Sequence, residues 1–166
     1  MKNAPTTNAE TLVWQRRLGY AGLIPFWFLA LVIAWFEITT AVNTSPNVSD
    51  AAVTGVVVYG AVIVSFMAAI HWGLALVHEH WRPARLPGPL FAVIPALLAW
   101  VLAAWAPASI AAAGMALLLG AIWIVERQTN AVSLWGRGYA RLRSHLTIGA
   151  TSALLLVALS LAATSR

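Results

Sequence analysis

The basic residues of this chain sit at alternate junctions of its long apolar runs. Nine of the ten lysines and arginines flank the first run, or lie between the second and third runs or between the fourth and fifth: Lys2, Arg16, Arg17, Arg82, Arg85, Arg127, Arg137, Arg141 and Arg143. The two other connections between runs carry none. Basic loops stay on the cytoplasmic side of a membrane during insertion. The pattern therefore predicts an all-α membrane bundle of five spanning helices, with the N-terminus inside and the C-terminus outside.

The composition excludes several classes of protein. The chain is 61% hydrophobic and only 9% charged, whereas soluble domains are about 25% charged. A soluble fold of this length would leave much of that apolar surface in water. The net charge of +5 does not indicate nucleic acid, because the arginines border the apolar runs instead of lining one soluble face. There is no cysteine, which excludes disulfides, thiolate catalysis and cysteine-ligated zinc.

Five runs have the length of about 20 residues that crosses a hydrocarbon core. They are Leu18–Thr40, Ala51–Val77, Leu86–Ala106, Ser109–Val125 and Leu146–Ala163. Residues 1–17 are expected to form a polar cytoplasmic tail and interfacial segment, and residues 18–166 a single transmembrane domain. Residues 128–145 are expected to lie in the inner interface as an amphipathic stretch, interrupted by Gly136 and Gly138. The turn at Pro107 predicts an antiparallel hairpin of the third and fourth spans.

The second span is the most informative helix. Ser65, Ala69 and Gly73 recur every four residues and form a small-residue ladder, which lets another helix approach closely. His71 lies about 160° from Ala69 around the helix. An intramembrane histidine is not expected to face lipid. The second span is therefore expected to contact protein on two sides, either within this bundle or in a membrane partner or oligomer.

The candidate site is a polar pocket in the inner half of the membrane. His71 lies eleven residues before Arg82, about 16 Å along the helix. The candidate cofactor-binding residues are His71, Trp72, His78 and Trp123. The candidates for a substrate or lipid headgroup are Arg141, Arg143 and Glu126. A structural role for His71 in packing is the simpler alternative, and both interpretations stay open.

Metal and haem chemistry have weaker support. His78 and His80 would point about 200° apart on a helix, so they cannot share one ion, and we expect no metal site. A haem held by His78 and His145 at the inner face is an alternative. Glu126 and Arg127 are expected to form a charge pair at the interface, and Glu37 to lie near the outer interface. The deep tryptophans are expected to add packing bulk, with a flat-ligand pocket as the alternative.

Four segments resemble an uncharacterised bacterial membrane family whose eukaryotic relative is called transmembrane protein sixty-nine. They are Gly22–Trp27, Tyr59–Leu76, Val93–Trp100 and Tyr139–Arg143. The run Ser-Phe-x4-His-Trp-Gly, which begins at Ser65, is the most specific part. The resemblance covers about residues 17–160. It implies a five-helix bundle in a bacterial or mitochondrial inner membrane, and it supplies no activity or catalytic residue.

The sequence therefore favours a non-enzymatic accessory or binding subunit of the inner membrane. No nucleotide-binding loop, zinc-protease helix or serine-hydrolase elbow is present. The first alternative is a ligand-binding or redox protein that holds haem, a quinone or another lipophilic ligand near His71. A small transporter is less favoured, because the spans carry almost no charge near their centres.

Overall fold

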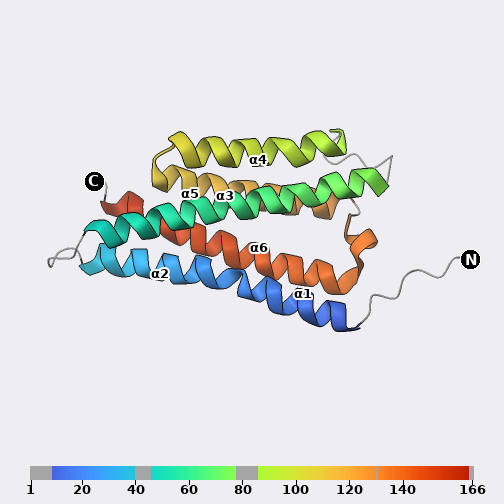
Figure 1. The fold of residues 1–166 in the computed structure, drawn as a ribbon, viewed down its shortest axis with the longest axis horizontal. Coiled ribbons are helices and arrows are strands. Elements are labelled where there is room, and N and C mark those ends of the chain that lie inside the picture. The colour runs from blue at the N-terminus through green and yellow to red at the C-terminus, as the bar shows by residue number, and fades with distance from the viewer. Residues whose placement is uncertain (1–8, 40–45, 78–85, 130, 165–166) are drawn as a thin grey trace, which may run out of the picture.

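The computed structural model describes residues 9–39, 46–77, 86–129 and 131–164, all of them in helices or short helix connections. The order is α1 (Ala9–Ala21), α2 (Leu23–Thr39), α3 (Pro46–Val77), α4 (Gly88–Trp105), α5 (Ala108–Gln128) and α6 (Ala131–Thr164). Helices α1 and α2 follow one another along one side of the bundle and are separated by a turn at Gly22 (Figure 1). The four remaining helices, α3 to α6, run lengthwise beside each other.

Five segments are long and apolar enough to cross a membrane, which confirms the expected number among the described residues. They are Val13–Glu37, Asp50–Val77, Gly88–Trp105, Ala108–Gln128 and Gly138–Ala163. Large apolar side chains such as Phe28, Trp35 and Leu117 are mostly exposed on the outside. So much exposed apolar surface suits lipid and would be a liability in water. The chain therefore has the character of a multi-pass membrane protein.

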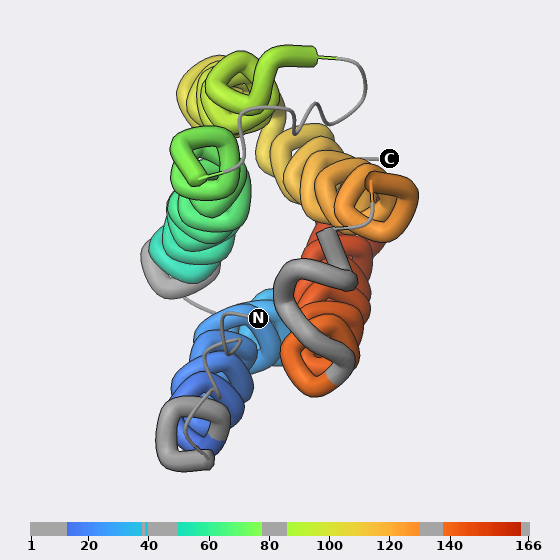
Figure 2. The backbone as a smooth tube through the Cα atoms, turned by 90° about the vertical axis from the view of Figure 1, so that its right-hand side faces the viewer, coloured from blue at the N-terminus to red at the C-terminus, as the bar shows by residue number. Residues whose placement is uncertain are grey.

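The helices form a closed ring, and two helices that are not neighbours in the ring also contact each other. Helix α2 packs on α3, α3 on α4, α4 on α5, α5 on α6 and α6 on α2, while α3 also contacts α5. Figure 2 shows this ring from its end, with α1 and α2 on the side opposite α4. The third and fourth spans are neighbours joined at Pro107, as the sequence predicts. The contact of α3 with both α5 and α2 makes it a central helix of the bundle.

Small residues and interlocking apolar side chains fill the interior. Ala30, Ala68, Ala112 and Ala153 are completely buried. Because alanine lets two helix backbones approach closely, such positions favour packing within lipid, where burial of apolar surface gives little drive for association. Larger buried side chains occupy the space between these contacts: Phe26, Ile33, Val64, Met115, Leu119, Ile122, Leu154 and Val157.

Helix α6 differs from expectation. Residues 131–164 form one helix, so Gly136 and Gly138 do not interrupt it, and the interfacial segment does not end at residue 145. A glycine inside a helix costs only about 1 kcal/mol relative to alanine, which a long helix tolerates. The membrane-compatible segment starts at Gly138, eight residues before the expected Leu146. Residue 17, the expected end of the interfacial segment, lies within α1, and that boundary stays a prediction.

Candidate functional site

His71 is completely buried in α3, which confirms that it faces protein and not lipid. Its Nδ1 atom lies 3.1 Å from the Met67 carbonyl oxygen and 3.2 Å from that of Ala68. Because a carbonyl oxygen only accepts hydrogen bonds, Nδ1 carries a proton and is the donor in these contacts. Phe91 of α4 packs edge to face against the imidazole ring, with ring centres 4.9 Å apart. These contacts fix the ring and direct Nε2 away from its own helix.

Nε2 of His71 is directed at Glu126, near the end of α5. The distance from Nε2 to Oε1 is 3.4 Å, and the Glu126 side chain is 2% exposed. The same carboxylate contacts Arg143 of α6 through both of its oxygens. Nη2 lies 2.9 Å from Oε1, and Nε lies 3.0 Å from Oε2. This forked geometry is the strong, charge-assisted form of an arginine–carboxylate pair.

His71, Glu126 and Arg143, called the buried cluster below, join three helices that the sequence keeps far apart. Each residue lies a few positions inside a membrane-compatible segment, where water cannot stabilise a charge. A buried pair with both partners in place is tolerated, whereas removal of one partner leaves an uncompensated charge and costs about 3–5 kcal/mol. The buried cluster thus allows α6 to carry an arginine within the membrane.

A cavity of about 380 Å³, called the slot below, adjoins the buried cluster at Arg143. It lies between α1, α2, α3 and α6, and Leu119 of α5 also lines it. Its walls are mainly apolar and include Leu18, Leu23, Phe26, Ile63, Phe66, Ile70, Leu142 and Leu146. Along α6 it extends from Tyr139 to Ala150, about 16 Å of helix. The apolar lining and the length of the slot along α6 suit a hydrocarbon chain.

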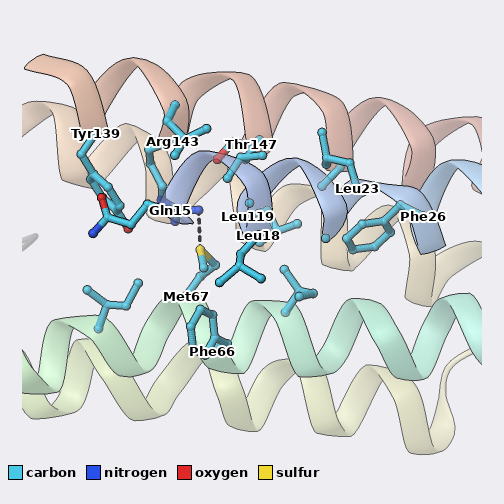
Figure 3. Close-up of a pocket in the computed structure, with 17 residues that line it drawn as sticks. Gln15, Leu18, Leu23, Phe26, Phe66, Met67, Leu119, Tyr139, Arg143 and Thr147 are labelled. Atoms are coloured by element: carbon cyan, nitrogen blue, oxygen red, sulfur yellow. Dashed lines mark hydrogen bonds between the residues drawn. The ribbon is translucent and has the colours of Figure 1, made fainter. Parts of the chain in front are cut away.

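The polar groups of the slot gather toward one end. Gln15, Tyr139, Arg143 and Thr147 line it there, while Phe26 lies at the opposite end (Figure 3). Arg143 belongs to both the slot and the buried cluster, because it lines the slot and binds Glu126. Its remaining terminal nitrogen, Nη1, contacts the Met67 sulfur, and a thioether is a weak acceptor. The buried Thr147 hydroxyl has no hydrogen-bond partner within the described part of the chain.

The predicted pairing of Glu126 with Arg127 is wrong. Arg127 is exposed and lies over the Trp123 ring, 4.9 Å from its centre. One position along a helix turns the side chain by about 100°, so the two neighbours face different surroundings. Arg141 and Arg143 are two positions apart and therefore point to nearly opposite sides of α6. Arg141 is exposed, whereas Arg143 is 5% exposed and lines the slot.

Neither Trp72 nor Trp123 joins His71. Trp72 is 47% exposed on the outside of α3. Trp123 donates from Nε1 to the Ser144 hydroxyl at 3.1 Å and does not line the slot. His78 lies outside the described residues, and His145 is hydrogen-bonded to the Tyr20 hydroxyl at 3.1 Å. The assignment of His71, Trp72, His78 and Trp123 to a cofactor therefore stays a prediction.

The deep tryptophans do not act mainly as internal packing. Trp27, Trp72 and Trp100 are all more than a third exposed on the outside of the bundle. The small-residue ladder also faces outward at Ala69 and Gly73, which are exposed. A side-chain carbon placed on Gly73 would meet nothing within 4 Å in the described structure. The helices packed on α3 within this chain use other faces.

Several polar or sulfur-containing slot residues are not among the site residues predicted from the sequence, namely Gln15, Met67, Tyr139 and Thr147. The sequence could have indicated two of them. Met67 lies four residues before His71 and Thr147 four residues after Arg143, and residues four apart share one face of a helix. For metal binding, no group of three His, Cys, Asp or Glu side chains comes together in the ranges that the structure covers.

Comparison with known protein families finds a match over most of the chain. The family described as "Protein of unknown function (DUF3429)" matches residues 14–159. The chain belongs to this family. The matched residues include all five membrane-compatible segments in whole or in large part, the buried cluster and every residue that lines the slot. No curated protein and no solved structure matches this member of the family.

Proposed function

We propose that this protein is a non-enzymatic binding subunit of a membrane, and that its slot holds a lipophilic molecule. The cavity volume of about 380 Å³ falls within the range of about 300–1,000 Å³ typical of small-molecule sites. Apolar walls with a few polar groups at one end suit an amphipathic ligand. The polar end would receive the headgroup, and the space between Leu23, Ile63 and Leu146 would receive the tail.

The observation that carries this proposal is the double role of Arg143. Apolar residues in place of a buried ion cluster are often neutral or stabilising, so folding alone does not require the buried cluster. Ionisable groups retained within a membrane mark functional sites. Here the buried cluster presents one of its members to a cavity of ligand size.

A matched pair of variants tests the proposal. Ile63 lines the slot, and its neighbour Val62 is exposed on the outside of α3. Ile63→Trp should fill the slot, whereas Val62→Trp adds the same bulk toward lipid. After purification in a mild detergent, native mass spectrometry should find a bound lipophilic molecule on the wild type and on Val62→Trp. The Ile63→Trp protein should lack it. Equal retention by all three proteins, or none on the wild type, would contradict the proposal.

We propose further that the protein resides in a bacterial inner membrane with its N-terminus in the cytoplasm. The support is the placement of the arginines at alternate connections. A relation to the eukaryotic transmembrane protein sixty-nine is part of the same proposal and rests on the motif around His71. In that orientation the polar end of the slot would lie in the cytoplasmic half of the membrane.

We also propose a membrane partner, or a second copy of the chain, on the outward small-residue ladder of α3. The exposure of Ala69 and Gly73 supports it, because small residues permit close helix contact. The chain has no cysteine, so Gly73→Cys introduces a single thiol. Oxidative crosslinking in membranes should trap a specific adduct, and a cysteine at the exposed Leu117 of α5 serves as the control.

A further inference from the structure

We infer that the headgroup held at the polar end of the slot is uncharged and carries a carbonyl oxygen. This inference rests on the proposed function and names the chemical class of its ligand. Two kinds of lipophilic molecule share that chemistry, a quinone and a neutral glycerolipid with ester carbonyls. The charge, the hydrogen-bond donors and the apolar lining of the slot support this class of headgroup.

The charge of Arg143 is already compensated. Three contacts of 2.9–3.3 Å join its guanidinium to both oxygens of Glu126. Of the described side chains that line the slot, Arg143 is the only charged one; Gln15, Tyr139 and Thr147 are uncharged. An anionic headgroup would add an uncompensated charge to a medium that stabilises charge poorly. An uncharged headgroup carries no such cost.

Two hydrogen-bond donors on α6 lack a good acceptor at this end of the slot. Nη1 of Arg143 is held only against the Met67 sulfur among the contacts described above, and the Thr147 hydroxyl is buried without a partner in the residues that the structure describes. Residues four apart lie one above the other on a helix face. A carbonyl oxygen has two lone pairs and no proton to donate. One such oxygen, or two neighbouring ester oxygens, can accept from both groups.

The shape of the slot places the headgroup and the tail. From Thr147 the α6 wall continues through Ala150, opposite Ile63 and Phe26. These residues offer no polar side chain, so a hydrocarbon tail extends toward them. Met67 is unbranched and flexible, so its sulfur can move aside when a carbonyl oxygen reaches Arg143.

Competitive native mass spectrometry of the purified full chain tests the headgroup class. The probes are decylubiquinone, dioctanoylglycerol and dioctanoyl phosphatidate, offered together at equal concentration. The wild type should bind at least one of the two uncharged carbonyl probes about tenfold in excess of phosphatidate. The relative occupancy of decylubiquinone and dioctanoylglycerol then identifies the source of the carbonyl. A wild-type preference for phosphatidate would overturn the inference while leaving the proposed function intact.

Two variants test the donors and the charge compensation. Thr147→Val should weaken carbonyl binding about fivefold without loss of stability, because the hydroxyl it removes is buried and unpartnered. Thr151→Val removes a similar buried hydroxyl outside the slot and should leave binding unchanged. Glu126→Gln leaves the arginine charge uncompensated and should shift the preference toward phosphatidate.

The outcomes separate the two proposals. If neither Thr147→Val nor Glu126→Gln changes the probe preference, the inference about the headgroup is wrong. If the wild type binds none of the probes and retains no lipophilic molecule at purification, both the inference and the proposed function fail.

Discussion

At the scale of single residues, Glu126 is the side chain on which the buried cluster depends. It contacts His71 on one side and Arg143 on the other, from three different helices. His71, Glu126 and Arg143 are all buried, so water cannot replace the carboxylate for either partner. Among the residues of the buried cluster, substitution of Glu126 is therefore expected to lower the stability the most.

Glu126→Leu should lower the free energy of unfolding by about 3–5 kcal/mol, because it leaves the Arg143 guanidinium buried and unpaired. Unfolding in mixed detergent micelles, followed by circular dichroism, measures the change. The double variant Glu126→Leu with Arg143→Met should recover most of the loss. A double variant as unstable as the single one would show that the pairing does not set the stability.

His71→Leu should have a smaller effect, about 1–3 kcal/mol. The loss comprises the contacts of the imidazole with carbonyl oxygens of its own helix, the contact with Glu126 and the edge contact with Phe91, and it leaves no charge unpaired. The loss of unfolding free energy caused by His71→Leu should nevertheless exceed that caused by Glu37→Gln, which lies at the less buried end of α2. The same unfolding assay compares the two. Equal tolerance of both substitutions would argue against the importance of the His71 face.

At the scale of helices, close contacts decide which positions accept a larger side chain. On α5, a β-carbon at Gly114 would lie 2.5 Å from a methyl carbon of Leu102 on α4, whereas one at Gly120 would meet nothing within 4 Å. Both glycines lie inside the helix, so an alanine at either would gain about 1 kcal/mol of helix propensity. The two positions therefore differ only in packing.

Gly120→Ala should be neutral or stabilising, while Gly114→Ala should be less stable than Gly120→Ala by about 1–3 kcal/mol, because Leu102 must move. Thermal unfolding of the two variants beside the wild type gives the comparison. Equal stability of the two variants would mean that α4 and α5 are not packed as described at this point.

Most of the membrane-compatible helices could be predicted from the sequence, but the limits of α6 could not. The apolar runs are long enough to read as spans, and Pro107 ends one helix at the start of the next. The run before Leu146 contains Arg141 and Arg143, which suggests an interfacial segment. Only the position of Glu126 on the neighbouring helix makes a buried Arg143 tolerable, and helix adjacency is not visible in a single sequence.

At the scale of the whole molecule, the candidate site comes from three helices around one end of a closed ring. The periodicity of α3 identifies His71 as facing protein, because polar side chains in spans avoid lipid. Its partners could not be assigned, since Glu126 and Arg143 are indistinguishable by sequence from ordinary interfacial charges. The slot could not be predicted either, because it depends on the angle at which α1 and α2 pass α6.

The placement of the arginines predicts that the N-terminus and the α3–α4 connection face the cytoplasm and that the C-terminus faces the outside. Since the chain has no cysteine, single cysteines at Asn3, Ala84 and Ser165 can report the side. A membrane-impermeant maleimide added to intact cells should label only the cysteine at residue 165. Labelling of residue 3 or residue 84 would contradict this orientation.

The central claim is that the buried cluster and the slot form one ligand site. An experimental structure of the protein in a lipid nanodisc tests it most directly. We expect elongated density in the slot, with its head within hydrogen-bond distance of Arg143 Nη1 and its tail toward Phe26 and Ile63. A slot closed by side chains, with Met67 still against Arg143 and no density between α2 and α6, would contradict the claim.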